Sequence, residues 1–376
     1  MQGPVTVFAE SGAFAGWPAN YGFWGFGPEL VAVIAVGRTA PPTVGPHGPG
    51  LHARDTSRPF RPMQVRSLDG GSTWMVEPFT GVQPGGATSL NADEHVDVAL
   101  RTASQLQSGS AFSAPPEPIT FDDPETAILC GRTGLGAGSV SWFYASTDRG
   151  RSWSGPFALP GFGRAGISAR TDVVPLGPNE ALFMLSSPNT AAAGEGGTIC
   201  AHTGDGGISF TLRGTVREAD ANGYAIMPST LLCPDGCLLT VIRRPGHLEA
   251  FRSEDFGRTW EQVSTNVAGT GRHGNPGSLV ALPDARVAVV YGRRDEPLAI
   301  CARTSGDEGS HWSAERVLVD LAGGTPDFGY VCTVSSPGGY VSIYYANRPS
   351  GDRVIEAVTW SADDLTWSNG PGQTLG

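Results

Sequence analysis

The sequence predicts an all-β protein, and three observations favour this class. Turn-forming residues are dense, with 53 glycines and 30 prolines among 376 residues, which is close to twice ordinary usage. Short apolar segments such as 229–244 and 277–294 hold a Pro-Asp turn at their centre, as β-hairpins do. One turn-like octet recurs along the chain. Charged residues make up only 16 % of the total, fewer than long helices carry.

The repeated octet follows the pattern Ser/Thr-x-Asp-x-Gly-x-Ser/Thr-aromatic. Its copies stand at 67–74, 146–153, 203–210, 253–260 and 305–312, and a shortened copy without glycine stands at 361–367. The corresponding aspartates are Asp69, Asp148, Asp205, Asp255, Asp307 and Asp363, between 50 and 79 residues apart. An aspartate in a turn accepts backbone N–H bonds, and the glycine supplies a left-handed position. We therefore expect these carboxylates to be structural, and neither catalytic nor calcium-binding.

This octet resembles the Asp-box of sialidases and related β-propellers, and we call each copy an Asp-box. The resemblance implies a single β-propeller domain over residues 1–376 with six four-stranded blades. Seven blades are the alternative, because the widest gap between copies, around 81–118, holds either a further blade or a long insertion. Few residues follow the last Asp-box, so we expect the segment 5–11 to supply the outermost strand and close the ring.

Composition excludes several classes of function. The net charge of −11 argues against a protein that binds nucleic acid. All 25 basic residues are arginine, which excludes a Schiff-base lysine, a lysine general base and a P-loop. No stretch of 18 apolar residues occurs, so we expect no membrane-spanning helix. We expect a monomer that is secreted or periplasmic after loss of a leader, with a cytoplasmic location as the alternative.

Cysteine and metal-ligand patterns are weak. We expect no cofactor and no metal site from the motifs present, although a calcium ion bound by backbone carbonyls in the channel stays open. Cys233 and Cys237 flank a Pro-Asp-Gly turn and could face each other across a hairpin. Buried free thiols are the interpretation that we favour for all six cysteines.

Propellers carry function on the loops that precede the innermost strand of each blade. These loops read GWPANYGFWGFGPE (16–29), ARTD (169–172), GYAIMPST (223–230), TGRHGNPGS (270–278) and PDFGYV (326–331). With the first Asp-box they resemble a bacterial and fungal group of sialidase-like proteins. That group is similar to rhamnosidases and rhamnose–glucuronate lyases that act on L-rhamnosyl-α-1,4-glucuronate caps of arabinogalactan. The resemblance implies an enzyme that releases L-rhamnose from an acidic oligosaccharide or polysaccharide, by β-elimination or hydrolysis.

Exo-sialidase activity is the second expectation, and a non-catalytic glycan-binding propeller is the third. Sialidases bind the sialate carboxylate with three arginines, of which the first stands in a Phe/Tyr-Arg-Ile-Pro motif near the N-terminus. They also use a Tyr–Glu pair and an aspartate. In this sequence no arginine precedes Arg38. Because this first arginine is missing, we rank sialidase activity below the rhamnose-releasing reaction.

A glucuronate lyase needs a cation on the carboxylate, a base for the C5 proton and an acid for the leaving oxygen. Histidine suits the base because it titrates near neutral pH, and arginine can hold a carboxylate with two bonds. The candidate catalytic residues are His52, oriented by Asp55, together with His273 and Tyr330. The candidate substrate-binding residues are Arg38, Arg54, Asp55, Arg170, Arg272, Arg293 and Trp24.

Each candidate also has a structural alternative. Arg170 and Arg293 could form ion pairs with Asp172 and Asp295, which follow them closely in the sequence. The two histidines could be turn residues, and the tyrosine could be a packed aromatic with its hydroxyl satisfied. Trp24 could plug the channel instead of forming a platform for a sugar ring.

Overall fold

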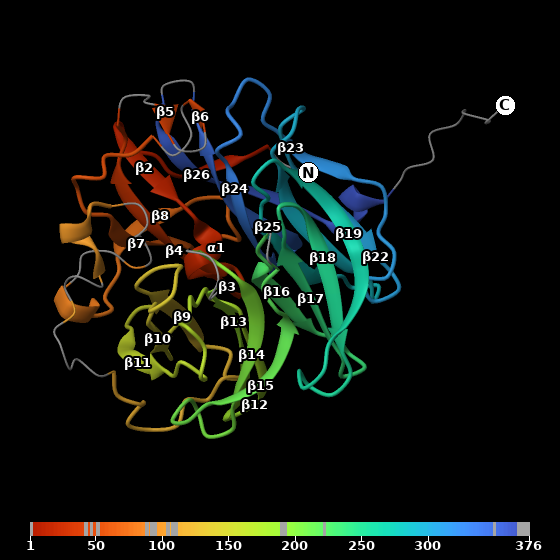
Figure 1. Ribbon diagram of the computed structural model, residues 1–376. Helices are drawn as coiled ribbons and strands as arrows, with labels where there is room; N and C mark the ends of the chain where they lie inside the picture. Colours follow the sequence, from red (N-terminus) through yellow and green to blue (C-terminus); the bar gives the residue numbers. More distant parts are fainter. Residues whose placement is uncertain are drawn as a thin grey trace.

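The computed structural model describes residues 3–40, 44–45, 48–49, 53–86, 90, 96–102, 106, 112–188, 194–220, 223–348 and 351–366. Within them the chain forms mostly strands and turns, and the sheets are arranged around a common centre as a propeller-like ring (Figure 1). The helical segments are α1 (Pro18–Tyr21), η1 (Pro84–Gly86), η3 (Val98–Leu100) and η4 (Ala362–Leu365). Among the described helices, none is long and apolar enough to cross a membrane.

Four sheets form separate blades in which consecutive strands pair antiparallel. Blade I contains β9 (Ala127–Arg132), β10 (Ser141–Ser146) and β11 (Ser154–Leu159). Blade II contains β12 (Val173–Gly177), β13 (Glu180–Ser187), β14 (Gly197–Thr203) and β15 (Thr211–Arg217). Blade III contains β16 (Ile226–Leu232), β17 (Leu238–Arg243), β18 (Gly246–Ser253) and β19 (Glu261–Gly271). Blade IV contains β20 (Gly277–Ala281), β21 (Val287–Arg293), β22 (Ala299–Ser305) and β23 (Arg316–Asp320).

The remaining long strands form one nine-stranded sheet. Its central path runs through β24 (Gly329–Ser336), β25 (Gly339–Asn347), β26 (Arg353–Trp360), β2 (Ala13–Gly16), β4 (Glu29–Arg38), β7 (Arg61–Ser67) and β8 (Met75–Pro78). Strand β3 (Phe23–Phe26) pairs with β4, and β1 (Val5–Phe8) pairs with β26. A short pair, β5 (Val44–Gly45) and β6 (Gly48–Pro49), lies outside this sheet.

Strand β2 explains why the nine strands form one sheet. It pairs antiparallel with β4 and parallel with β26, where Phe14 lies opposite Arg353. The N-terminal and C-terminal strands are therefore joined. The described chain has four separate blades, and the six or seven separate blades predicted from the sequence are not found. At the edge of this sheet, Val5 of β1 lies opposite Ala357 of β26.

The first strands of neighbouring sheets face one another at the centre of the ring. Hydrogen bonds join the first strand of one sheet to the first strand of the neighbouring sheet, or to the residue that precedes that strand. These bonds run from Thr230 Oγ1 to Asp172 Oδ2 (2.8 Å), from Leu279 N to Ser229 Oγ (2.9 Å) and from Thr333 N to Ser278 Oγ (2.9 Å). Buried apolar side chains of adjacent blades, such as Leu239 of β17 and Val289 of β21, pack between the sheets.

The Asp-box turns have the structural role predicted for them. In the copy at 253–260, Ser253 Oγ donates to Asp255 Oδ1 (2.9 Å), and the Thr259 N–H and hydroxyl donate to the two carboxylate oxygens (2.9 and 2.7 Å). Trp260 Nε1 then donates to the Gly257 carbonyl (3.1 Å). Burial alone would raise the pKa of Asp255, but these hydrogen bonds outweigh it and lower the pKa to about 2. Equivalent bonds hold the turns of Asp69, Asp148, Asp205 and Asp307.

The last Asp-box departs from the pattern. Asp363 was the expected carboxylate, but Asp364 accepts the N–H and the hydroxyl of Ser361 (2.8 and 3.0 Å). Without the glycine the chain continues into the 3-10 helix η4, and Ser361 and Asp364 form a capping box at its start. The aromatic residue of this copy, Trp367, lies outside the described residues.

Candidate functional site

Residues that precede or begin the first strands converge at one end of the ring, which we call the mouth. Four non-glycine residues there adopt left-handed backbone angles, namely Trp17 (φ 60°), Met227 (φ 52°), His273 (φ 69°) and Tyr330 (φ 51°). This conformation is uncommon for such side chains. Residues in this backbone conformation cluster at functional sites, so the mouth is the candidate functional site.

Tyr330 lies among arginines at the mouth. Arg243, the last residue of β17, donates from Nη1 to the Tyr330 hydroxyl oxygen (3.0 Å) and from Nη2 to the His273 carbonyl (2.6 Å). Its guanidinium carbon lies 5.5 Å from the centre of the Tyr330 ring, within cation–π range. Burial lowers the pKa of Arg243, but the neighbouring Tyr330, Tyr224 and Glu195 outweigh burial and raise it. Arg243 therefore stays charged at every relevant pH.

Arg170, which precedes β12, is the second buried cation of the mouth. Arg170 is only 5 % exposed. Its Nε donates to Asn20 Oδ1 (2.9 Å), and its Nη2 forms an ion pair with Glu195. Within the described part of the chain, its Nη1 is buried without a hydrogen-bond partner. The charge of Glu195 also acts on Arg243, which places the two arginines near the same carboxylate. We call Arg170, Glu195, Arg243 and Tyr330 the mouth cluster.

A buried network fixes Tyr330 from behind. Asn275 Oδ1 accepts the Tyr330 N–H (3.0 Å), and Tyr345 packs edge-on against the Tyr330 ring at 5.8 Å. The Tyr345 hydroxyl donates to Asp327 (2.8 Å), which also accepts from Arg353 Nε (3.0 Å). Burial raises the pKa of Tyr345 well above its usual value, so this hydroxyl keeps its proton and its place in the network.

Arg294 is the second arginine that contacts Tyr330. Its guanidinium carbon lies 5.8 Å from the Tyr330 ring centre. Its Nη1 donates to the Gly274 carbonyl (3.0 Å), and its Nη2 donates to Phe328 O (2.7 Å) and to the Tyr345 hydroxyl (2.9 Å). Since these bonds engage the guanidinium within the protein, Arg294 supports the site and is less suited to bind a ligand.

Asp172 is a half-buried carboxyl that directly precedes β12. It accepts hydrogen bonds from the Thr230 hydroxyl (2.8 Å) and N–H (3.3 Å). Its charge contributes to raising the pKa of Cys130 in blade I and of Cys332 in β24, which places it between sheets on different sides of the ring. Burial raises the pKa of Asp172 to about 7. The sequence offered Asp172 as an ion-pair partner of Arg170, but Arg170 pairs with Glu195.

His273, Arg272 and Arg293 lie around the mouth in different settings. His273 contributes its carbonyl to Arg243 and Tyr224, and its residue is exposed. Arg272 is exposed, and its N–H lies 3.3 Å from Asp295 Oδ1. Arg293 forms an ion pair with Glu315 and donates from Nε to the Pro297 carbonyl (2.9 Å). The Arg293 side chain is thus directed to Glu315, whereas His273 and Arg272 are exposed at the rim of the mouth.

Three further candidates lie together elsewhere. Arg38 forms an ion pair with Glu10 (2.9 Å) and lines a surface cavity of about 410 Å³. The Asp55 N–H donates to the Arg38 carbonyl (2.9 Å), while Thr39 and Arg54 form an isolated bridge. Hydrogen bonds from Ser57 lower the pKa of Asp55. His52, which Asp55 was expected to orient, lies outside the described residues.

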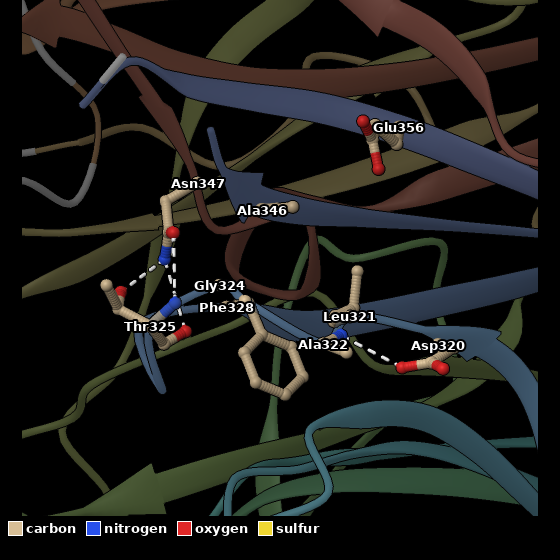
Figure 2. Close-up of a pocket in the computed structure, with 10 residues that line it drawn as sticks. Asp320, Leu321, Ala322, Gly324, Thr325, Phe328, Ala346, Asn347 and Glu356 are labelled. Atoms are coloured by element: carbon tan, nitrogen blue, oxygen red, sulfur yellow. Dashed lines mark hydrogen bonds between the residues drawn. The ribbon is translucent and has the colours of Figure 1, made fainter. Parts of the chain in front are cut away.

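Trp24 lines a second cavity, of about 480 Å³, formed with the far ends of the first strands, including Leu231, Ala281 and Ser335. Its ring packs against Trp153 with centroids 5.4 Å apart. A further cavity of about 270 Å³ lies beside the loop before β24 (Figure 2). There Asn347 Oδ1 accepts the Thr325 N–H (3.1 Å), as Figure 2 shows.

Among the described residues, the one group of side chains placed to hold a metal ion is Cys233, Asp235 and Cys237, on the hairpin between β16 and β17. The mouth cluster instead offers guanidinium groups and a phenol. Such groups bind anions and move protons. Sequence reasoning identified Arg170 and Tyr330 but missed Arg243 and Glu195; the repeated Arg-Arg pairs at 243–244 and 293–294 were the available signal.

The fold is similar to several solved structures. A protein of unknown function from Dyadobacter fermentans matches with a TM-score of 0.68 and 19 % identity, over 94 % of this chain and 96 % of that chain. A Trypanosoma rangeli sialidase in complex with 2,3-difluorosialic acid matches with a TM-score of 0.60 and 10 % identity, over 96 % and 58 % of the two chains. A mutant of NanB sialidase from Streptococcus pneumoniae gives 0.59 and 12 %, over 97 % and 71 %. These identities show a shared fold alone.

No curated protein matches the chain. A family model described as the BNR repeat-like domain matches residues 118–343, which is more than half of the chain. The matched stretch contains four of the Asp-boxes and runs from the loop before blade I into β25. On these grounds the chain belongs to the BNR repeat-like family, within the sialidase-like Asp-box superfamily.

Proposed function

We propose that the protein is a carbohydrate-active enzyme that releases a terminal sugar from an acidic glycan at the mouth cluster. The observation that carries this proposal is the buried Arg170 guanidinium, whose Nη1 has no hydrogen-bond partner within the described residues, in one cluster with the Arg243–Tyr330 pair. A buried N–H without a partner is costly. A glycan carboxylate would satisfy it with a charge-assisted bond.

The proposed roles follow from this arrangement. Arg170 binds the glycan carboxylate, and Arg243 adds positive charge beside it. Tyr330 transfers a proton at the reacting sugar, because its phenol can donate and accept a proton and the hydrogen bond from Arg243 holds it at the mouth. Glu195 holds Arg170 in place. The left-handed backbone of Tyr330 and the buried network behind it keep the phenol in position for this role.

For the substrate we propose L-rhamnosyl-α-1,4-glucuronate ends, on the resemblance carried by the loops before the first strands. In an elimination, a base removes the C5 proton, the C4–O4 bond breaks, and O4 leaves with rhamnose after taking a proton. The product keeps a C4=C5 double bond. In a hydrolysis, water adds across the same glycosidic link and no double bond forms. The partner in either case is a soluble acidic oligosaccharide or polysaccharide.

Exo-sialidase activity is the second candidate. It is favoured by one specific observation: a tyrosine, a glutamate and two arginines gather in one cluster at the mouth, which are the residue types that a sialidase uses. A glycan-binding propeller without turnover is the third. All three candidates place a carboxylated sugar at the same arginines, so they are separated by product and not by binding.

The test incubates the protein with gum arabic and, separately, with sialyl-lactose. Free rhamnose together with ultraviolet absorbance of an unsaturated uronate indicates a lyase, and rhamnose alone indicates a hydrolase. Free sialic acid from sialyl-lactose would establish the second candidate. Binding without any product would establish the third and overturn the enzyme proposal.

The site is tested by matched substitutions. Tyr330→Phe should lower kcat by about 10²–10⁴-fold, the range for loss of a general acid or base, while Tyr340→Phe should leave it unchanged. The Tyr340 hydroxyl donates to the Ala281 carbonyl near the far ends of the first strands. Arg170→Lys should raise KM, because lysine lacks the planar fork. Arg258→Lys, in an Asp-box turn, is its control.

The number of blades around the axis is a separate question. The nine-stranded sheet contains two groups of four strands, β3-β4-β7-β8 and β24-β25-β26-β1. An Asp-box connects β7 to β8 and another follows β26. We propose that these groups act as two blades, which would give six around the axis.

A further inference from the structure

The hairpin between β16 and β17 carries a second cluster of reactive side chains, independent of the mouth. Its turn is Cys233-Pro-Asp-Gly-Cys237, and the ligand atoms of Cys233, Asp235 and Cys237 all lie within 4.8 Å of one another. We propose that this cluster is a binding site for a thiophilic divalent cation of the Zn²⁺ class. The two thiolates and the Asp235 carboxylate would be its ligands.

The backbone of the turn brings the three groups together. The Cys233 N–H donates to the Cys237 carbonyl (2.8 Å), which closes the hairpin, and the Gly236 N–H donates back to the Cys233 carbonyl (2.9 Å). The Cys237 N–H lies 3.2 Å from Asp235 Oδ1, so the aspartate folds over the turn toward the thiols. Gly236 has φ 89°, an angle that glycine adopts without strain.

The spacing suits a tetrahedral ion. Zinc binds sulfur at about 2.3 Å and carboxylate oxygen at roughly 2.0–2.2 Å. Two ligand atoms in a tetrahedral site are therefore roughly 3.5–3.8 Å apart. Ligand atoms already within 4.8 Å need only small side-chain movements to close on an ion. Thiolate ligands select soft or borderline cations such as Zn²⁺ or Cd²⁺ over Ca²⁺ and Mg²⁺.

A neighbouring Asp-box turn completes the electrostatics of the site. Glu308, in the Asp-box of blade IV, accepts from Arg252 Nη2 (2.8 Å), and the same nitrogen lies 3.5 Å from Asp235 Oδ2. Glu308 thus lies beside the cluster, on a different sheet, and is linked to Asp235 through Arg252. With both cysteines ionised, the groups carry four negative charges against one arginine, which favours a divalent cation.

The site also lies between two blades. Because Glu308 comes from blade IV and the turn from blade III, the ion would tie two blades together and stabilise the ring.

The experiment titrates the full-length reduced protein with CdCl₂ and follows the ultraviolet cadmium–thiolate band. We expect saturation at one ion per chain and a higher Tm. Cys233→Ser and Cys237→Ser should lose the band, whereas Cys301→Ser, a buried cysteine outside the cluster, should keep it. Glu308→Gln should weaken binding by about 10-fold, and Glu254→Gln, which loses only its pairing with Arg252, should not.

Asp235→Asn provides a variant that tests the site without altering the core, because its side chain is 48 % exposed. It should fold normally and bind cadmium more weakly. Absence of the band in folded, reduced wild-type protein overturns the proposal. So does a band that persists in the Cys233→Ser/Cys237→Ser double variant, or isolation of the pair as a disulfide whose reduced form does not bind cadmium.

Discussion

The Asp-box turns and the mouth use the same backbone conformation for different ends. Left-handed residues occur in both regions, at Arg149, Phe256 and Glu308 in the Asp-boxes and at Met227 and Tyr330 in the mouth. In the five Asp-boxes that contain the glycine, the hydrogen bonds to the carboxylate come from residues of the same turn. At the mouth the bonds reach across the ring, as from Arg243 to Tyr330, 87 residues apart. The turns repeat one local solution, whereas the mouth is assembled from distant parts of the chain.

The largest expected difference between the two regions is in stability. Asp327, behind the mouth, is buried with Arg353 at 3.0 Å, and their side chains are 1 % and 4 % exposed. Asp327→Ala should lower the free energy of unfolding by about 3–5 kcal/mol, because it removes the carboxylate from a buried ion pair. Chemical denaturation with two spectroscopic probes measures this change. A loss below about 1 kcal/mol would mean that solvent reaches Arg353 and that the network is not rigid.

The stability that the two regions contribute should change with pH in opposite directions. The pKa of Asp172 is raised by burial to about 7 from 3.8, so the folded protein holds a proton that the unfolded chain has released between these values. Its contribution to stability is full below about pH 4 and falls as the pH rises to about 7, by at most about 1.4 kcal/mol per pH unit.

Asp172→Asn should remove this slope, as shown by denaturation curves from pH 4 to 8 for the two proteins. Asn can keep a bond to Thr230 without a charge. An unchanged slope in the variant would assign the pH dependence to another group. For the Asp-box, the pKa of Asp255 is lowered to about 2, so its contribution is present above about pH 4 and is lost as the pH falls toward 2.

The smallest expected effect is that of a single Asp-box. Asp255→Ala removes the bonds from Ser253 and Thr259 and should cost about 1–2 kcal/mol, as loss of a comparable cap does. It should leave kcat and KM unchanged, because the turn has no part in the mouth. Thermal denaturation measures the stability, and a steady-state assay on the substrate proposed above measures kcat and KM. An effect on kcat would contradict the separation of the two regions.

The same comparison explains how much could be predicted from the sequence. Five Asp-box turns were confirmed because each depends on about eight consecutive residues. The sixth was wrong by one position, with Asp364 in place of Asp363, because the missing glycine let a 3-10 helix form. The count of six or seven separate blades failed at β2, since a single parallel pair between Phe14 and Arg353 leaves no local pattern in the sequence.

The mouth shows why its residues were only partly predicted. Both Arg-Arg pairs follow apolar strands, and alternation of side chains along a strand means that one residue of each pair faces the mouth and the other faces away. In the first pair Arg243 reaches Tyr330, and in the second Arg294 does. The sequence analysis selected Arg293, which bonds to Glu315 instead. The choice depends on strand register, which one sequence does not define.

The position of β2 also constrains how the chain is made. Its parallel partner β26 follows all four separate blades in the sequence, so during translation β2 must wait until these blades and β26 have been synthesised. Closing so long a loop is slow, and until then the strand edges of the early segments stay open to pairing with other chains. Ring closure is accordingly the step at which folding and aggregation compete, because it depends on the arrival of β26.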